Sequence, residues 1–292
     1  MKAQRYAVIG VFLIFVTLGL SLGVGLGVGL RSKKKVTSSA TDHQSPKKIW
    51  LPAIGSTWDY HLQNTVKQIN KKTDIYDIDL FDNSAKEIES LHDNNKKVIC
   101  YFSAGSYEDW RSDSKLFKKS DLGKPLDGWK GERWVNISSS NVRDIMRKRI
   151  KMAHDKKCDA IDPDNIDGYD NKNGLGLTKH DSIDFIKYLS KVTHSYNMSI
   201  GLKNSDSIIK KVINDVDFSV QEQCVQYDNC KDYQEFIKNE KCVFHVEYPK
   251  GEKNNNKNVS ASTVKRICSN KSSKGFSTIL KNLDLDNWIQ FC

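Results

Sequence analysis

Short runs of β-forming residues alternate along the chain with stretches in which apolar residues recur at helical spacing. One helical stretch places Ile183, Ile186 and Leu189 on one face, behind a capping box formed by Thr178 and Asp181. Eight alternating β and α units predict an α/β fold of the (β/α)8 TIM barrel type, whose active site lies at the carboxyl ends of the strands. A doubly wound open sheet is the alternative, although no G-x-G-x-x-G turn supports it. The expected strands are Lys48–Leu51, Ile75–Phe81, Val98–Ala104, Cys158–Asp162, Ser199–Lys203, Phe218–Gln221, Val243–Tyr248 and Phe276–Lys281.

The amino-terminal region is apolar. Residues 6–30 carry no charge, and at about 1.5 Å per residue a helix of this length crosses a hydrocarbon layer of about 30 Å. Residues 1–30 are therefore predicted to hold a single transmembrane helix that anchors the protein in a membrane. A cleaved secretory signal peptide is the alternative, but its apolar region is usually only about 7–15 residues long. Residues 31–48 form a basic polar linker, and residues 49–292 form one domain without a second linker.

The positive charge of the chain is localised. The net charge is +10 in total, of which residues 1–48 contribute +7, so residues 49–292 carry the remaining +3. A nearly balanced domain behind a basic segment indicates contact of that segment with anionic lipid headgroups, and we expect no nucleic-acid partner.

The signals for topology conflict. More cations follow the apolar segment than precede it, which by the positive-inside rule favours a cytoplasmic domain. Seven cysteines, two of them close together at Cys224 and Cys230, favour an oxidising compartment instead. Glycosylation sequons point the same way. We expect an extracellular or lumenal domain, membrane-anchored or alternatively secreted, with one cysteine left over. The sequons begin at Asn136, Asn197, Asn258 and Asn270.

The segment Cys158–Tyr169 holds four carboxylates in nine residues, Asp159, Asp162, Asp164 and Asp167. Because Pro163 has no amide donor, we expect the strand to end before it and the later carboxylates to lie at its carboxyl end. Like charges gathered in an ordered place favour an active site over a solvated acidic turn. A calcium loop is a weaker alternative, since its D-x-D-x-D-G spacing is broken. Asp159, at the start of the strand, could simply bond backbone amides.

Polar residues also follow the other expected strands where each strand ends. A barrel would bring these residues around one mouth, although each taken alone has an ordinary surface interpretation. They are Asp79, Asp82, Ser103, Glu108, Arg111, Lys203, Asn204, Glu222 and Glu247.

These residues restrict the chemistry. The chain has no G-x-S-x-G elbow, H-E-x-x-H motif or phosphate-binding loop, which excludes serine hydrolases, zincins and P-loop enzymes. Carboxylates surrounded by aromatic and basic side chains match glycoside hydrolysis, in which one acid attacks and the other protonates the leaving oxygen. No metal or cofactor is expected. Aromatic residues that could stack on sugars, or equally fill a core, are Trp50, Trp58, Tyr60, Tyr101, Trp110 and Tyr169.

Four motifs resemble glycoside hydrolase family 114 in its fungal form: ICYFSAGSYEDWR at 99–111, DAIDPDNIDGY at 159–169, GLKN at 201–204 and QEQC at 221–224. The resemblance runs from about residue 49 to residue 292. It implies a (β/α)8 barrel and an endo-α-1,4-polygalactosaminidase activity, and members of the family are often labelled α-galactosidases. It also implies that Asp164 is the nucleophile and Glu222 the acid/base of a retaining mechanism. Cys242, before the seventh expected strand, departs from the pattern and leaves the disulfide pairing open.

The implied mechanism requires Glu222 to keep a proton while Asp164 is ionised, with Lys203 and Arg111 lowering the pKa of Asp164. The implied partner is a polysaccharide of the galactosaminogalactan type, whose cationic sugars an acidic mouth would attract. The sequence leaves open whether the sugar is acetylated galactosamine, free galactosamine or galactose. An exo-acting α-galactosidase and a non-catalytic sugar-binding cell-surface barrel are the alternatives. Expected substrate-binding residues are Asp79, Tyr101, Glu108, Arg111, Asp162, Asn165, Asp167, Tyr169, Lys203 and Glu247.

Overall fold

A computed structural model describes residues 49–251 and 257–292. The predicted transmembrane helix lies outside these residues. Within the described ranges, no helix is both long enough and apolar enough to cross a membrane.

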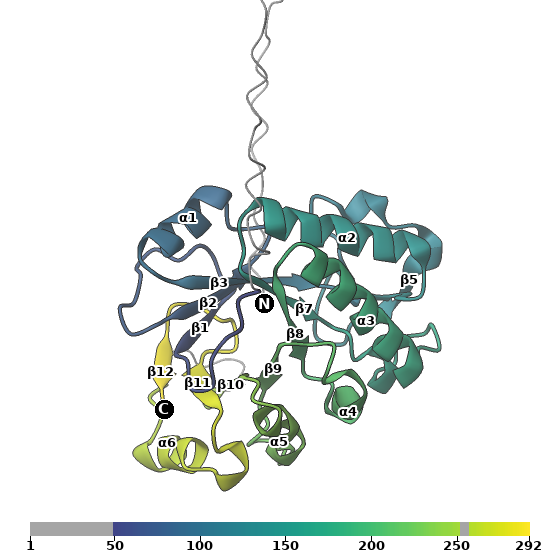
Figure 1. Ribbon diagram of the computed structural model, residues 1–292. Helices are drawn as coiled ribbons and strands as arrows, with labels where there is room; N and C mark the ends of the chain where they lie inside the picture. Colours follow the sequence, from purple (N-terminus) through teal and green to yellow (C-terminus); the bar gives the residue numbers. More distant parts are fainter. Residues whose placement is uncertain (1–48, 252–256) are drawn as a thin grey trace, which may run out of the picture. The chain divides into compact units, whose positions relative to one another are not determined.

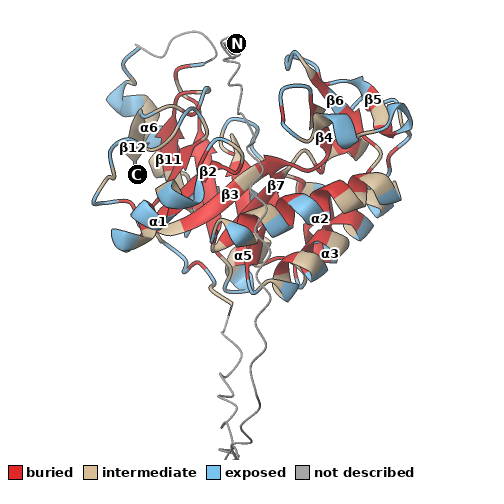
Figure 2. Cartoon of the chain, turned by 90° about the horizontal axis from the view of Figure 1, so that it is seen from above, coloured by how far each residue is buried: buried red, intermediate tan, exposed pale blue. Residues whose placement is uncertain are grey.

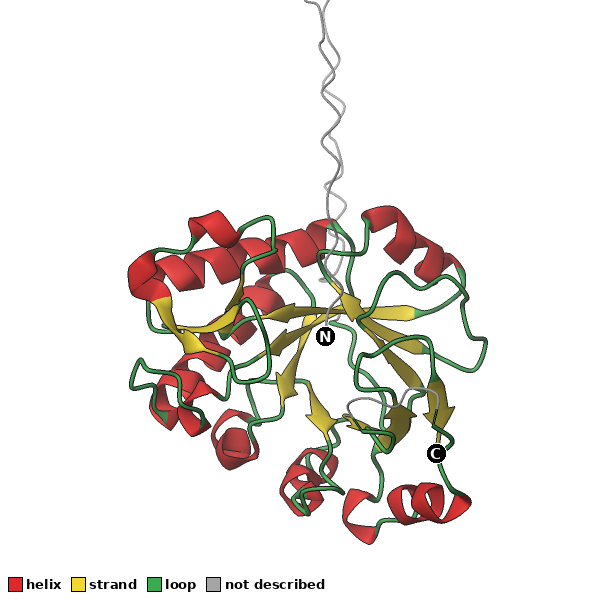
Figure 3. Ribbon diagram, turned by 180° about the vertical axis from the view of Figure 1, so that it is seen from behind, coloured by secondary structure: helices red, strands yellow, loops and turns green. Residues whose placement is uncertain are grey.

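The core of the domain is a nine-stranded sheet that curves into a nearly closed barrel (Figure 3). Eight neighbouring strands pair in parallel, and the last strand pairs antiparallel with β11. The parallel barrel order expected from the sequence is confirmed. In spatial order the strands are β1 (Trp58–His61), β2 (Ile75–Asp79), β3 (Lys97–Ser103), β7 (Ala160–Asp164), β8 (Ser199–Lys203), β9 (Phe218–Glu222), β10 (Val243–Glu247), β11 (Ser277–Lys281) and β12 (Ile289–Phe291).

The barrel closes through side chains. In the described chain β1 and β11 are not neighbours in the backbone ladder, but Trp58 Nε1 donates to Ser277 O at 2.8 Å. Lys281 Nζ donates to Asp59 Oδ1 at 2.7 Å within the same seam. The predicted cylinder is therefore complete in strand order but not in backbone hydrogen bonding.

Two predictions about individual strands were wrong. Residues 49–51 are not a strand, and the first strand begins at Trp58; Pro52 follows the expected run and cannot donate to a ladder. The strand β7 also continues through Pro163 to Asp164. Its pairing with β8 ends at Ile161, whereas its pairing with β3 continues to Asp164. The missing amide of Pro163 therefore leaves no gap in either ladder.

Six α-helices of the described chain lie outside the sheet (Figure 1). The capping box of Thr178 and Asp181 begins α3 as predicted. The loop from β1 to β2 contains no helix, so the outer layer is less regular than the prediction. The helices are α1 (Ala85–Asp93), α2 (Ser140–Asp155), α3 (Lys179–Ser195), α4 (Ile209–Val212), α5 (Cys230–Lys238) and α6 (Ala261–Cys268). Short 3-10 helices are η1 (Ser114–Leu116), η2 (Lys119–Asp121), η3 (Gly168–Asp170), η4 (Asp206–Ile208) and η5 (Lys271–Ser273).

A small second sheet interrupts the unit between β3 and α2. Its strands are β4 (Ser106–Glu108), β5 (Leu122–Pro125) and β6 (Glu132–Val135), in the order β4-β6-β5. Figure 2 shows this sheet beside the buried strands of the barrel. The insertion directly follows the strand that lies next to the acidic segment, so it helps to wall the mouth of the barrel.

Two apolar clusters support the sheet from its two sides. One fills the barrel interior and includes Trp58, Ile99, Phe218 and Phe244, and the other packs helices against the outer face. Gly201 is needed in the interior, because a Cβ there would lie 2.6 Å from Phe218 Cε2. The tightly packed interior fixes the strands, and with them the residues at the strand ends.

Three disulfides stabilise the domain: Cys100–Cys158, Cys224–Cys230 and Cys268–Cys292. Cys224 and Cys230, which lie close together in the sequence, thus close a short loop. Cys242 is the cysteine left over; it is buried, and burial raises the pKa of its thiol to about 12. Because the thiol of Cys242 is buried and stays protonated, we expect it to be unreactive.

Candidate active site

Lys203 lies at the centre of the barrel mouth between two carboxylates. Asp164, Lys203 and Glu222 are the last residues of β7, β8 and β9, so adjacent parallel strands bring them together. Lys203 Nζ lies 3.5 Å from Asp164 Oδ2 and 3.3 Å from Glu222 Oε2. The lysine side chain is 1% exposed, whereas those of Asp164 and Glu222 are 18% and 24% exposed. The two predicted catalytic acids therefore face solvent across a buried cation.

Asp164 is held in place by its neighbours. Tyr101 OH donates to Asp164 Oδ2 at 2.8 Å, and the backbone amide of Asn165 donates to Oδ1 at 2.7 Å. Lys203 Nζ in turn donates to Tyr60 OH at 2.6 Å. The first two contacts fix the orientation of the Asp164 carboxylate, and the third holds the Lys203 ammonium.

Glu222 is held from the other side. Tyr248 OH donates to Glu222 Oε1, and Asn204 Nδ2 donates to Oε2 at 3.2 Å. Burial alone would raise the pKa of Glu222, but Lys203 and the hydrogen bonds from Tyr248 and Asn204 lower it below its usual value. The expectation that Glu222 keeps a proton is thus not met in the substrate-free protein, because Lys203 lies as close to this acid as to Asp164.

A pair of buried carboxyls, Asp77 and Asp162, lies beneath Asp164 and Glu222. Neither side chain is exposed, and neither carboxylate has a hydrogen-bond partner in the described chain when both are ionised. Burial raises the pKa of Asp162 to about 7, with repulsion from Asp164 and Glu222 adding to the effect and Lys203 opposing it. Burial and repulsion from Asp162 likewise raise the pKa of Asp77. A proton on one of the pair lets it donate to the other.

Three predicted substrate-binding residues lie together in a buried ion-pair cluster. Arg111 Nη1 donates to Asp79 Oδ1 at 2.9 Å, and Arg111 Nε donates to Glu108 Oε2 at 2.7 Å. Both carboxylates raise the pKa of Arg111, although burial opposes them. These groups bind one another beside the small second sheet, and a direct contact with substrate stays a prediction.

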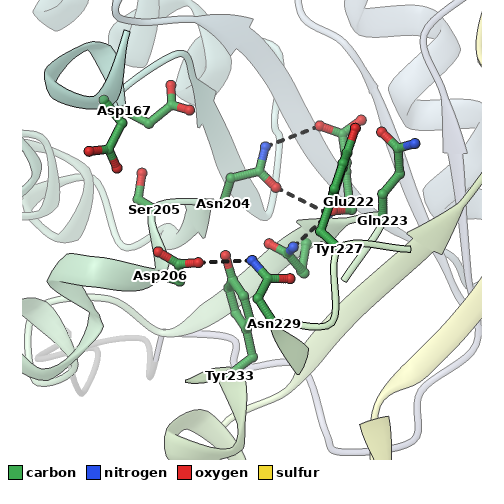
Figure 4. Close-up of a pocket in the computed structure, with 11 residues that line it drawn as sticks. Asp167, Asn204, Ser205, Asp206, Glu222, Gln223, Tyr227, Asn229 and Tyr233 are labelled. Carbon is green, nitrogen blue, oxygen red and sulfur yellow. Dashed lines mark hydrogen bonds between the residues drawn. The ribbon is translucent and has the colours of Figure 1, made fainter. Parts of the chain in front are cut away.

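Other predicted residues shape the loops around the mouth. Asn165 Nδ2 donates to Ser106 Oγ at 3.0 Å and thereby ties the acidic segment to β4. Gly105 permits this approach, because a Cβ there would lie 1.7 Å from Asn165 O. Tyr169 bonds Ser207 at 2.9 Å. Figure 4 draws a side chain of the same acidic segment, Asp167, at the edge of a cavity.

Two acids of the region have structural partners. Glu247 Oε1 accepts from the amide of Val225 at 2.7 Å and bonds His245 Nε2 at 2.9 Å. Asp159 lies at the opposite end of its strand, where it accepts from the amide of Val98 at 2.9 Å. The expectation that Asp159 bonds backbone amides is confirmed.

The cavity beside Glu222 has a volume of about 280 Å³ (Figure 4). It includes Glu222 and Asp167 among the predicted site residues. Its other residues come from β9, from α5 and from the segments that follow β7, β8 and β9, and of these only Asn204 was among the strand-end residues expected from the sequence. They are Asp170, Asn204, Ser205, Asp206, Gln221, Gln223, Tyr227, Asn229 and Tyr233.

One group of potential metal ligands occurs in the described chain, formed by Cys224, Cys230 and His245. The two sulfur atoms are joined in a disulfide, and His245 bonds Glu247 and Thr278. The cluster in this state is therefore a packed structural element rather than a metal centre.

Comparisons with known proteins agree with the geometry. The sequence matches the profile of glycoside-hydrolase family GH114 over residues 39–292. The crystal structure of Aspergillus fumigatus Ega3 in complex with galactosamine is 52% identical, with a TM-score of 0.82, and the match covers 85% of this chain and 99% of that one. The glycoside hydrolase domain of PelA from Pseudomonas aeruginosa shares the fold, with a TM-score of 0.61 at 9% identity over 81% of this chain and 98% of that one.

A search of curated protein sequences finds no match. The family profile nevertheless spans the whole barrel, and the motifs that carried the sequence resemblance supply the acids at its mouth. The chain belongs to glycoside hydrolase family 114 and is a glycoside hydrolase.

Proposed function

We propose that this glycoside hydrolase cleaves α-linked polysaccharides that contain galactosamine, with Asp164 as nucleophile and Glu222 as acid/base. The observation that carries the proposal is the placement of both acids at one mouth, on either side of Lys203. The solved complex of a 52% identical relative with galactosamine supports the sugar class.

In the proposed reaction the Asp164 carboxylate attacks the anomeric carbon while the glycosidic C–O bond breaks. The leaving oxygen takes the proton of Glu222. Water then attacks the glycosyl–enzyme ester, returns a proton to Glu222 and frees Asp164. The nearest carboxylate oxygens of Asp164 and Glu222 are no further apart than the sum of the two distances from these carboxylates to Lys203 Nζ. That limit allows the separation of about 5–5.5 Å used by retaining enzymes.

In this proposal Glu222 becomes protonated when substrate binds. In the free site the ammonium of Lys203 lowers the pKa of Glu222, whereas a sugar that covers the mouth removes water and strengthens the effect of burial, which raises the pKa. If that increase did not occur, Glu222 would stay ionised and would not serve as the acid.

Chemical rescue tests the assignment. Asp164→Asn and Glu222→Gln are assayed on a galactosamine oligomer and on an aryl α-galactosaminide with an activated leaving group. Asp127→Asn, in an exposed turn, controls for loss of one charge. Glu222→Gln should keep its activity on the aryl substrate, and azide should increase that activity. Asp164→Asn should lose its activity on both substrates while keeping its fold.

If azide rescued Asp164→Asn and not Glu222→Gln, Glu222 would be the nucleophile and Asp164 the acid/base. Wild-type activity in either variant would refute the catalytic role of that residue, and Asp162 or Asp167 would then be the next nucleophile candidate to test. Proton NMR of the first product should show retention of configuration.

Product sizes distinguish the alternatives. An internal cut yields a ladder of oligomers, an exo-acting α-galactosidase releases monosaccharide, and a sugar-binding barrel yields no product. We favour the internal cut from the family resemblance, and mass spectrometry of digested galactosaminogalactan would test it.

We further infer that residues 6–30 anchor an extracellular or lumenal domain, with secretion as the alternative. The three disulfides of the domain support an oxidising compartment. Asn197 and Asn258 are the exposed sequons. Glycosidase treatment of membrane fractions should increase mobility, and substituting both residues with Gln should remove most of the shift. If the mobility did not change and the domain were protected from protease in sealed cells, the domain would lie in the cytoplasm.

A further inference from the structure

The cavity beside Glu222 extends away from the nucleophile. Glu222 is part of its wall, whereas Asp164, Lys203 and Tyr101 are not. The acid of a glycosidase must touch the oxygen that leaves, so the sugar bonded to that oxygen lies on the side of the acid. The cavity therefore lies where the leaving part of a polymer would be received.

The polar wall of the cavity consists mainly of acceptors. Gln221 is 2% exposed; its Nε2 donates to Glu222 O at 2.8 Å, while its Oε1 is buried and has no partner in the described chain. Asn229 is arranged in the same way, with Nδ2 donating to Asp206 Oδ2 at 2.8 Å and Oδ1 without a partner. Both amides thus use their donors on the protein and keep an acceptor.

Carboxylates complete this wall. Asp167, Asp170 and Asp206 contribute three, and none of the eleven residues that line the cavity is a lysine or an arginine. Figure 4 shows Asp206 next to Asn229, with the side chain of Tyr233 beside them. Tyr227, at the rim, is 65% exposed and offers a flat face to a sugar ring. A ligand that fits must bring donors and positive charge.

We propose that this cavity is the binding subsite for the first sugar on the leaving-group side, and that it selects a sugar with a free, protonated amine. The inference rests on the proposed function, because it uses Glu222 as the acid. An ammonium supplies three donors to a wall of acceptors, and its hydrogen bonds to carboxylates are charge-assisted. An acetamido group brings only one donor and no positive charge. A hydroxyl leaves the carboxylates without a counter-charge.

The test compares substrates that do and do not occupy this subsite. An α-1,4-galactosamine oligomer fills it, an N-acetylated oligomer fills it without the charge, and the activated aryl α-galactosaminide does not use it. The key variant is Asp206→Asn, which keeps an oxygen for Asn229. Asp170→Asn serves as a second variant, because the exposed side chain of Asp170 is not needed for folding. Asp127→Asn is the matched charge control.

We expect Asp206→Asn to lower kcat/KM on the free-amine oligomer at least tenfold more than on the aryl substrate, and to reduce the preference for the free amine over the acetylated oligomer. Asp170→Asn should act in the same direction but less strongly, since its charge is screened by solvent. Equal losses on both substrates, or equal cleavage of both oligomers by the wild type, would overturn the inference. Failure of the wild type on every substrate would instead refute the proposed function.

Discussion

Replacing Lys203 with Met tests whether the buried ammonium organises the active site. Methionine has a similar length and fills the space without charge. In the native site Lys203 Nζ faces three carboxylates, at 3.3 Å from Glu222, 3.5 Å from Asp164 and 3.9 Å from Asp162. It also donates to Tyr60. The substitution therefore leaves the acids without their central counter-charge.

The size of the effect follows from these distances. At an effective dielectric constant of about 20, each ion pair is worth about 4–5 kcal/mol of Coulomb energy. The cost of burying Lys203, which is 1% exposed, offsets several kcal/mol of this sum. Breaking a buried ion pair typically costs about 3–5 kcal/mol, and we expect a loss of this size in the free energy of unfolding at pH 8. The loss should be smaller at pH 5, because the acids then take up protons.

The same change should raise the pKa of Glu222, since Lys203 is the main group that lowers it. Urea unfolding at pH 5 and pH 8 measures the stability. The pH dependence of kcat/KM on the galactosamine oligomer, whose leaving oxygen needs the proton of Glu222, measures the titration. Lys203→Arg, which keeps the charge, is the control. Equal stability of Lys203→Met and wild type at pH 8, together with an unchanged alkaline limb of the pH profile, would refute the central role of the lysine.

Three further predictions concern the surrounding structure. Gly105→Ala should lower activity by displacing the acidic segment, because its Cβ would meet Asn165 O; wild-type kcat/KM would contradict this. Asp162→Asn should stabilise the protein relative to wild type at pH 8 but not at pH 4: the folded pKa of about 7 lies above the unfolded value near 4, so ionisation between these pH values lowers stability by up to about 4 kcal/mol. Thermal unfolding across pH checks this, and a pH-independent difference would refute it. Replacing Cys268 and Cys292 with Ser should cost about 3 kcal/mol in urea unfolding through lost loop closure.

The order of the strands was predictable because parallel strands buried on both faces are nearly continuous apolar runs. The strand β1 was missed for the opposite reason. Its sequence alternates aromatic residues with Asp59 and His61, yet all four positions are buried. The charge of Asp59 is paired with Lys281, more than two hundred residues away. A pairing between the two ends of a barrel leaves no local signal.

The placement of Asp164 and Glu222 at the mouth was predictable because both residues end strands. Asp77 instead lies inside β2, two residues before Asp79. Its position on the same face of the strand was the available signal. The cavity had no such signal. Gln221 and Asn229 are ordinary polar residues whose role depends on which atom of each amide the fold leaves unpaired, and this is decided by partners such as Asp206.

The position of the acceptor wall resolves a conflict in the chemistry. A cationic sugar suits an acidic mouth, but an ammonium next to Glu222 would lower its pKa further and oppose the protonation that the leaving oxygen requires. Lys203 already acts in this direction. Figure 4 draws Asp206 and Asn229 on one side of the cavity and Glu222 with Asn204 on the other. An ammonium bound at Asp206 therefore contributes binding energy away from the acid, while the sugar ring that it positions covers Glu222 and favours the protonated state.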